Sequence, residues 1–301
     1  LFDSEGNTFL DLESGVWCTP LGHSHPEIVK IISQQSRNFM HSGYCYYSNI
    51  INNTAKKILE ITGIAKGKCV FLCSGSEAVE YSVQLIKSFT DKPYFLTMKN
   101  CYLSAYGVSG ERSADHWIHF DWMNKDTLDS IDFSKVAAFV FEPGSSGGLV
   151  HFPPKNLIEE IINRVRASGG YIITNEVTTG IGRTGRWFGY KHYDFTPDIV
   201  AMGKGLGNGY PVSCAAISES VLKHVNLSKF CYAQSHQNDP LGAAVAGKVI
   251  EVIEDKMLLD KAHKLGKLIV KKLNNLKKKY GIIKEVRGRG LIIAVEFEQC
   301  N

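Results

Sequence analysis

Residues 69–88 read CVFLCSGSEAVEYSVQLIKS, and this stretch decides the fold class. Its first five residues form a short apolar run, which is typical of a strand that is buried on both faces of a sheet. A Ser-Gly-Ser turn follows, and after it apolar side chains return at helical spacing over residues 77–88. A buried strand that leads into an amphipathic helix is the repeating unit of α/β folds.

The same alternation continues along the middle of the chain. Further short apolar runs lie at residues 94–98, 137–141, 171–174, 199–202 and 212–217. One further helical pattern lies at residues 157–166. Strands that alternate with helices predict an α/β fold, in which a mixed but mostly parallel sheet is covered by helices on both faces.

The two ends of the chain have a different pattern. Residues 1–7 read as a strand that runs into a turn, and two helical patterns precede a strand at residues 290–297. We expect a large domain over residues 46–245. We expect a smaller α+β lobe that is formed by both ends of the chain. Residues 1–45 are expected to be its N-terminal part with a linker, and residues 246–301 the start of an incomplete C-terminal domain.

Composition excludes several classes of protein. The 301 residues include 34 Lys and Arg against 30 Asp and Glu, and the formal net charge of +4 is too weak to predict a nucleic-acid partner. No apolar run approaches the roughly 20 residues of a membrane span, so no membrane partner is expected. The eight cysteines are scattered without a CxxC pair. We therefore expect no metal site and a reducing, cytoplasmic location.

Polar residues and glycines follow three of the predicted strands. Ser74-Gly75-Ser76 stands where a helix begins, and it reads either as an anion site or as a plain helix cap. Lys204 follows a strand among glycines, so it reads either as a desolvated nucleophilic amine or as a surface lysine. Asn175 ends a strand that breaks into glycines, at the edge where open α/β sheets bind ligands.

In this order, the three patterns resemble those of the class III pyridoxal-phosphate aminotransferases of fold type I. Residues 10–15 and 21–26 are similar to the N-terminal motif of that family, Glu142-Pro143 resembles its Glu-Pro, and Pro240-Leu241 follows its cross-subunit loop. The resemblance implies a pyridoxal 5'-phosphate enzyme. Its expected reaction moves an amino group from an amine, ω-amino acid or amino acid to a 2-oxo acid.

The resemblance also implies a role for each matching residue. Lys204 is the expected catalytic residue, which forms a Schiff base with the cofactor and then moves protons. The expected cofactor-binding residues are Ser74, Gly75, Ser76, Tyr102, Glu142, Asn175, Val177, Thr178, Lys204 and Ser235. Ser235 matches a residue that the neighbouring subunit donates, which implies a homodimer with shared active sites, or a dimer of dimers. Trp17 is expected to line the substrate pocket, with a core tryptophan as the alternative.

Several positions depart from the family pattern. Asn175 stands where the family has an Asp that keeps the pyridine nitrogen protonated, and Glu176 is expected to point the opposite way. Thr178 replaces a Gln that binds the cofactor oxygen, and Tyr102-Leu103-Ser104 replaces an aromatic-His-Gly sequence.

The expected substrate and reaction also depend on such departures. Residues 144–148 read GSSGG, where ornithine-type members carry Gln-Gly-Glu, whose Glu gates a carboxylate-binding arginine. That arginine is expected beyond residue 301, and Arg289 is expected to be structural. The alternatives are decarboxylation, racemisation or epimerisation, or aminomutase chemistry on the same fold, a non-catalytic homologue, and a nicotinamide-dependent oxidoreductase.

Overall fold

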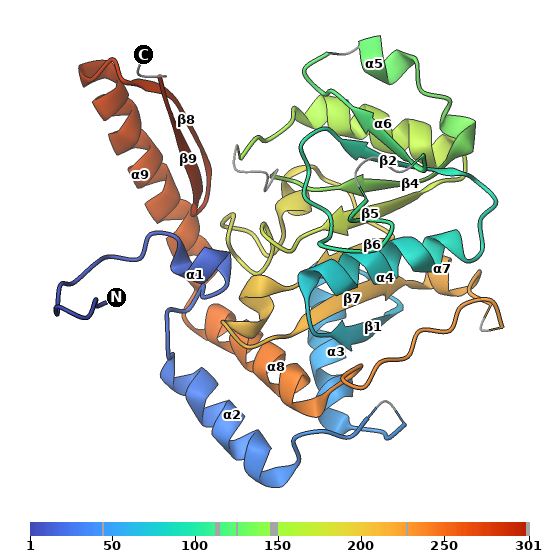
Figure 1. Cartoon of the computed structure of the whole chain (residues 1–301), viewed down its shortest axis with the longest axis horizontal. Coiled ribbons are helices and arrows are strands. Elements are labelled where there is room, and N and C mark those ends of the chain that lie inside the picture. Colours follow the sequence, from blue (N-terminus) through green and yellow to red (C-terminus); the bar gives the residue numbers. More distant parts are fainter. Residues whose placement is uncertain (44, 112–114, 125, 145–149, 227, 299–301) are drawn as a thin grey trace.

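The structure of the protein is a computed structural model that describes residues 1–43, 45–111, 115–124, 126–144, 150–226 and 228–298 (Figure 1). Within these ranges a sheet of seven strands has the order β1-β7-β6-β5-β4-β2-β3. Its strands are β1 (Gly67–Leu72), β2 (Tyr94–Met98), β3 (Trp117–Phe120), β4 (Val136–Phe141), β5 (Tyr171–Asn175), β6 (Ile199–Met202) and β7 (Ser213–Ser218). Strand β7 is antiparallel to both neighbours and the other pairs are parallel. The predicted mixed, mostly parallel sheet is confirmed.

Helices cover both faces of this sheet. The helix α4 (Gly75–Lys87) packs over β5, β6 and β7, on the face that carries Ile173 and Ile199. On the opposite face, α3 (Asn49–Thr62) and α8 (Pro240–Asp255) pack together beside buried Val200. The helix α6 (Lys155–Ala167) packs against β4 and β5. This two-sided burial explains why the central strands are apolar on both faces.

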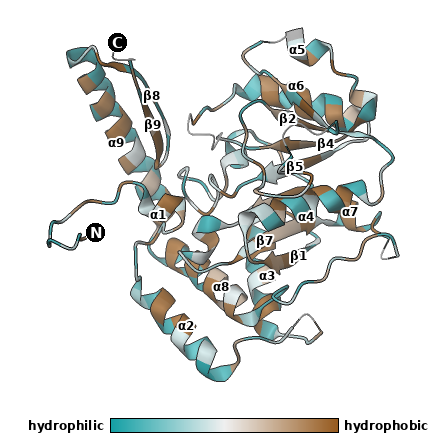
Figure 2. Cartoon of the chain, in the orientation of Figure 1, coloured by the Kyte–Doolittle hydropathy of each residue, from teal (hydrophilic) through white to brown (hydrophobic). Residues whose placement is uncertain are grey.

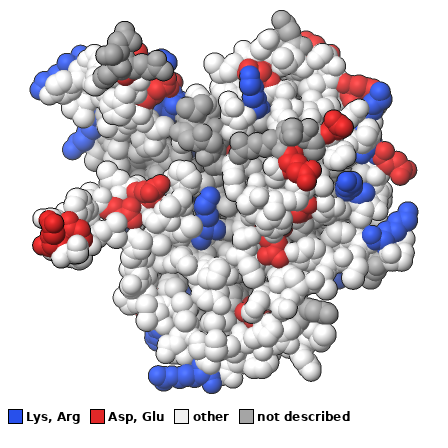
Figure 3. All heavy atoms as spheres, viewed as in Figure 1, with Lys and Arg blue, Asp and Glu red and all other residues white. Residues whose placement is uncertain are grey.

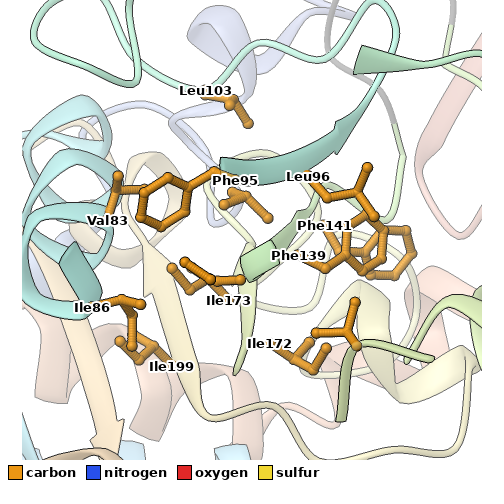
Figure 4. Packing of buried hydrophobic residues seen from close by; sticks show 14 of the residues in the cluster. Val83, Ile86, Phe95, Leu96, Leu103, Phe139, Phe141, Ile172, Ile173 and Ile199 are labelled. Atoms are coloured by element: carbon orange, nitrogen blue, oxygen red, sulfur yellow. The ribbon is translucent and has the colours of Figure 1, made fainter. Parts of the chain in front are cut away.

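Side chains of neighbouring positions in one strand enter different parts of the core. In Figure 4, Ile173 lies with Ile86 of α4, whereas Ile172 lies on the other side of the sheet with Phe139. The central strand β4 is correspondingly hydrophobic in Figure 2. The short elements between the main ones are α5 (Asp126–Asp129), α7 (Glu219–Leu222), η1 (Phe133–Lys135), η2 (Gly189–His192) and η3 (Lys204–Gly207).

The C-terminal residues form a separate layer beside the sheet (Figure 1). The helix α9 (Leu258–Lys279) packs on an antiparallel pair, β8 (Ile283–Arg289) and β9 (Ile292–Phe297). Only the second of these strands was expected from the sequence. Strand β8 lacks an apolar run because its charged residues pair on the surface, as Arg287 does with Glu285 and Glu296.

The N-terminal region differs from its prediction. Of the strand expected at residues 1–7, the structure has one bridge, between Phe2 and Thr8, around a turn. The carboxylate of Asp3 holds this turn because it accepts hydrogen bonds from the backbone N–H groups of Glu5 and Asn7, at 2.9 and 2.8 Å. Such local bonds favour a turn over a paired strand.

The next two helices bear on the division into domains. The first, α1 (Ser14–Trp17), is a single turn, and α2 (Pro26–Asn38) packs against α8. The expected boundary between residues 245 and 246 falls inside α8. We therefore propose that the C-terminal unit begins after Asp255, and the division between residues 45 and 46 stays a prediction.

Two surface properties complete the fold. On the face seen in Figure 3, basic and acidic side chains are interspersed and do not gather into a field of one sign. Among the described residues, no helix combines the length and the apolar character that crossing a bilayer requires.

Candidate active site

The carboxyl ends of β1, β4, β5 and β6 open onto one cavity of about 210 Å³. It is lined by Ser74, Gly75, Ser76, Tyr102, Leu103, Glu142, Asn175, Val177, Thr178 and Lys204. The structure thus brings together nine of the ten residues that the sequence predicts as cofactor-binding. Leu103 also lines the cavity and was not predicted; its place directly after Tyr102 was the available signal.

The N-terminus of α4 forms one wall of the cavity. The Ser74 hydroxyl caps the helix by accepting a hydrogen bond from the Glu77 N–H at 3.2 Å. Gly75 lies so close to the loop after β5 that a Cβ atom there would stand 2.5 Å from a methyl group of Val177. The absence of a side chain at Gly75 therefore keeps the first turn of the helix within reach of a ligand. A helix N-terminus of this kind favours an anionic group.

Lys204 enters the cavity from the end of β6. Its backbone has a φ of 42°, a left-handed conformation that is uncommon for a residue with a side chain. Burial lowers the pKa of its amine, while Cys18 and Glu142 oppose that shift. The Nζ atom stands 5.3 Å from the centre of the Trp17 ring. A partly desolvated amine with a lowered pKa is the form of lysine suited to nucleophilic chemistry, which favours this interpretation of half-buried Lys204 over a surface lysine.

Backbone groups hold the polar side chains at the ends of β4 and β5. The Asn175 amide donates from Nδ2 to the Tyr102 carbonyl at 2.9 Å and accepts at Oδ1 from the Val177 N–H at 3.2 Å. The buried Glu142 carboxylate accepts from the Tyr102 N–H at 3.2 Å and from the Thr178 hydroxyl at 3.3 Å. These bonds fix the orientation of both groups before any ligand binds.

Glu176 points away from the cavity, as expected from the alternation of side chains along a strand. Its carboxylate is fully buried and accepts hydrogen bonds from the N–H groups of Gly189 and Tyr190 and from the Thr179 hydroxyl, at 2.7, 2.8 and 2.7 Å. Burial raises its pKa to about 7. Glu176 therefore holds the loop behind the sheet and does not replace the missing carboxylate at position 175.

Two other predicted residues lie outside the cavity lining. Ser235 is exposed in the segment before α8. Trp17 is half-buried, and its carbonyl accepts a hydrogen bond from the Arg183 guanidinium at 3.1 Å, which places its ring near Lys204. Trp17 thus lies beside Lys204 without lining the cavity.

Two further expectations concern Arg289 and the loop that follows Pro143. The Arg289 guanidinium lies over the rings of Phe152 and Tyr193, at 4.4 and 5.2 Å, which agrees with its expected packing role. Residues 145–149, which cover most of the position of the expected gate sequence, lie outside the described residues.

A larger hollow of about 1240 Å³ lies elsewhere, between α3, α6 and the segment 185–196, and none of the predicted site residues lines it. Its cations already bind backbone carbonyls, as Arg166 does with Thr196 at 2.6 Å and Lys191 with Thr62 at 2.9 Å. The smaller cavity is the better candidate because its polar groups converge on one partly desolvated amine, that of Lys204.

Comparisons with known proteins agree with this geometry. The family model "Aminotransferase class-III" matches residues 1–107 and 124–301. The chain is 28% identical to the acetylornithine aminotransferase of Methanocaldococcus jannaschii, over 99% of the chain and 78% of that protein. It is also 28% identical to the alanine/serine racemase of Pyrococcus horikoshii, over 99% of the chain and 71% of the relative.

Solved structures show the same fold. The acetylornithine aminotransferase of Elizabethkingia anophelis superposes with a TM-score of 0.87 at 26% identity, over 99% of this chain and 76% of the other. A transaminase from a marine Virgibacillus superposes with a TM-score of 0.91 at 26% identity, over 99% and 75%. The predicted fold type I and the predicted reaction class, amino-group transfer, are confirmed. The chain belongs to the class III aminotransferases, a family that depends on pyridoxal phosphate.

Proposed function

We propose that this chain binds pyridoxal 5'-phosphate on Lys204 and uses it to move an amino group from a small-molecule donor to a 2-oxo acid. One observation carries the proposal: a half-buried lysine whose amine has a lowered pKa faces a cavity whose wall is a helix N-terminus. The amine can bind an aldehyde, and the helix N-terminus can bind a phosphate.

The residues of the cavity fit that cofactor. Gly75 and Ser76 would hold the phosphate at the start of α4, where a side chain at position 75 would collide with Val177. Tyr102 and Val177 supply apolar surface for the two faces of a flat ring. Asn175 offers a hydrogen bond for the ring nitrogen, and Thr178 a hydroxyl for the ring oxygen.

When bound, the cofactor supplies an electron sink for the substrate carbon that loses a proton. The chain supplies the proton transfer, because burial lowers the pKa of the Lys204 amine and so favours the neutral form that can accept a proton from that carbon and return it. Asn175, which the Tyr102 carbonyl holds in place, would orient the ring nitrogen and would add no charge. Among the described residues that line the cavity, Glu142 alone carries a carboxylate, and Tyr102 and Thr178 hold it in place.

The donor is proposed to be an amine or an ω-amino acid with an apolar part. The half-buried Trp17 ring supports this, because it offers apolar surface beside the Lys204 amine. Acetylornithine is the substrate in the names of several relatives, but residues 144–148 lack the Gln-Gly-Glu sequence expected of that type. A panel of amine donors, with pyruvate and 2-oxoglutarate as acceptors, separates these substrates.

Racemisation is the second candidate function. It is favoured by the alanine/serine racemase among the relatives and by the neutral Asn175. Single-turnover spectroscopy of the holoenzyme with a donor and no acceptor distinguishes the two. Transamination predicts stoichiometric conversion of the cofactor to its amine form. A substrate that loses its optical activity while the cofactor stays unchanged would establish the racemase instead.

A homodimer and a cytoplasmic location belong to the same proposal. The exposed position of Ser235, outside the lining of the cavity of its own chain, supports its expected role in a partner subunit. The cysteines that the structure describes are free thiols, which supports a reducing compartment. Sedimentation velocity of the holoenzyme measures the oligomeric state, and fractionation of cells that produce it measures the location.

A further inference from the structure

Three side chains that can bind a metal ion meet outside the candidate active site. His41 comes from the segment after α2, and His236 and Asp239 come from the segment before α8. One ligand atom of each residue lies within 4.8 Å of the other two. No metal site was expected from the sequence, because 198 positions separate His41 from Asp239.

The distances between these atoms suit a zinc ion. Zinc binds histidine nitrogen and carboxylate oxygen at about 2.0–2.2 Å, so tetrahedral ligands stand roughly 3.3 Å apart. Nδ1 of His41 lies 3.2 Å from one carboxylate oxygen of Asp239, and Nδ1 of His236 lies 3.8 Å from the other. The two imidazole rings stand 4.7 Å apart, centre to centre. The three ligand atoms lie within 4.8 Å of one another, so rotation of the exposed imidazole rings would bring them to the spacing of zinc ligands.

The loop that carries two of the ligands is fixed to the sheet. Asn238 donates its backbone N–H to the Phe71 carbonyl and accepts the Phe71 N–H on its side chain, both at 2.9 Å. The His236 N–H donates to the Gln234 side chain at 2.7 Å. Asp239 is the N-cap residue of α8, yet its carboxylate does not cap the helix and turns to the two imidazoles. A prearranged carboxylate costs little ordering entropy when it binds an ion.

There is also access for an ion and space beside it. The side chains of His41 and His236 are 43% and 57% exposed, whereas Asp239 is 16% exposed. His236 and Asp239 line a hollow of about 190 Å³ that also receives Tyr210 and Cys73. This volume accommodates the water molecule that takes the fourth position of a zinc ion with three protein ligands.

We propose that His41, His236 and Asp239 bind one zinc ion, which joins the segment after α2 to the segment before α8. Two imidazoles and one carboxylate are a ligand set that zinc accepts, with an open position for water. Because α2 packs against α8, the ion would reinforce a contact that the fold already makes. None of the three ligands lines the cavity that contains Lys204 in the same chain.

Metal titration of the purified holoenzyme tests the proposal. After removal of metal with a chelator, zinc is titrated by calorimetry, and cobalt(II) is followed by its visible absorbance. We expect one ion per chain in the native protein. His41→Asn and Asp239→Asn should each weaken binding by more than about tenfold, since even indirect partners of metal ligands change affinity by 10- to 100-fold. His116→Asn, which removes an exposed histidine elsewhere, is the matched control and should bind as the native protein does.

Thermal unfolding supplies a second measurement. Zinc should raise the melting temperature of the native protein and of His116→Asn, but not that of His41→Asn, because an ion stabilises only the state that binds it. Unfolding without zinc shows whether each variant is folded. Equal zinc affinity of the native protein and of folded His41→Asn would overturn the proposal. A thiolate-to-cobalt absorption band would also overturn it, because the ion would then sit on cysteine.

Discussion

The end of strand β5 separates two buried polar regions that face opposite sides of the sheet. The cavity side contains Glu142, Asn175, Thr178 and Lys204, and the rear side contains Glu176 with the turn at Gly189. Three donors satisfy the rear carboxylate, whereas the cavity side presents a desolvated amine to open space. Adjacent positions in one strand thus serve different purposes. Glu176 stabilises the scaffold, and the cavity residues remain available to a ligand.

Removal of the Lys204 side chain from the cavity side should have the largest effect on cofactor binding and activity. Lys204→Ala should abolish the visible absorbance of bound cofactor and lower kcat/KM by roughly 10³-fold or more, since it removes the proposed attachment and proton transfer together. Lys191→Ala is the matched control, because burial also lowers the pKa of that amine outside the cavity. If both variants kept the absorbance of bound cofactor, Lys204 would not be the reactive lysine, and the distinction between a reactive cavity side and a structural rear side would be wrong.

Glu176, on the rear side of the sheet, should influence the free energy of unfolding and the way that this free energy depends on pH. The folded-state pKa of Glu176 is raised from 4.5 to about 7, so the folded protein holds this proton more tightly than the unfolded chain does. The contribution of Glu176 to the free energy of unfolding is therefore fully present below pH 4.5. It falls by about 3 kcal/mol as the pH rises toward 7.

Glu176→Gln removes that titration. Urea unfolding between pH 4.5 and 7 should give a flatter pH dependence for Glu176→Gln than for the native protein. The exposed Glu13→Gln variant is the control and should keep the native slope. A native slope in Glu176→Gln would show that the buried carboxylate does not titrate in this range.

Asn175→Asp tests the charge of the cavity side. A carboxylate beside the ring nitrogen should favour its protonated form, so the pH at which the cofactor spectrum changes should rise by about one unit or more. The exposed Asn163→Asp variant adds the same charge outside the cavity and should leave the spectrum unchanged. An unaltered spectrum in folded Asn175→Asp would mean that position 175 does not contact the ring nitrogen.

Ser235 is expected to have the smallest effect, and the effect should cross the subunit interface. Loss of one hydrogen bond of about 1 kcal/mol to the phosphate weakens cofactor binding by about fivefold. In hybrids of Ser235→Ala with Lys204→Ala subunits, the intact Lys204 should receive an intact Ser235 from its partner. Native affinity at that site supports the shared arrangement, and weakened affinity would place Ser235 in the site of its own chain.

Much of the fold could be predicted from the sequence because burial on both faces leaves continuous apolar runs, as in β4 and β6. Strand β8 could not, since it is half-exposed and charged, and the N-terminal turn is decided by the side chain of Asp3. The domain boundary was placed inside α8 because apolar periodicity continues through that helix.

Most of the cavity lining could be predicted because strand ends of a parallel sheet converge, and the resemblance supplied Tyr102 and Thr178. The contact of Gly75 with Val177 needed the structure. The same holds for His41 and Asp239, since no local pattern relates residues that only tertiary packing joins.

The covalent attachment of the cofactor is the central claim, and one measurement tests it most directly. The holoenzyme is reduced with borohydride, digested and mapped by mass spectrometry, with the Lys191→Ala variant treated in parallel. The account predicts that in both proteins the reduced cofactor is found on the peptide that contains Lys204. Cofactor on another lysine, or a fully folded and cofactor-saturated protein with none attached, would contradict it.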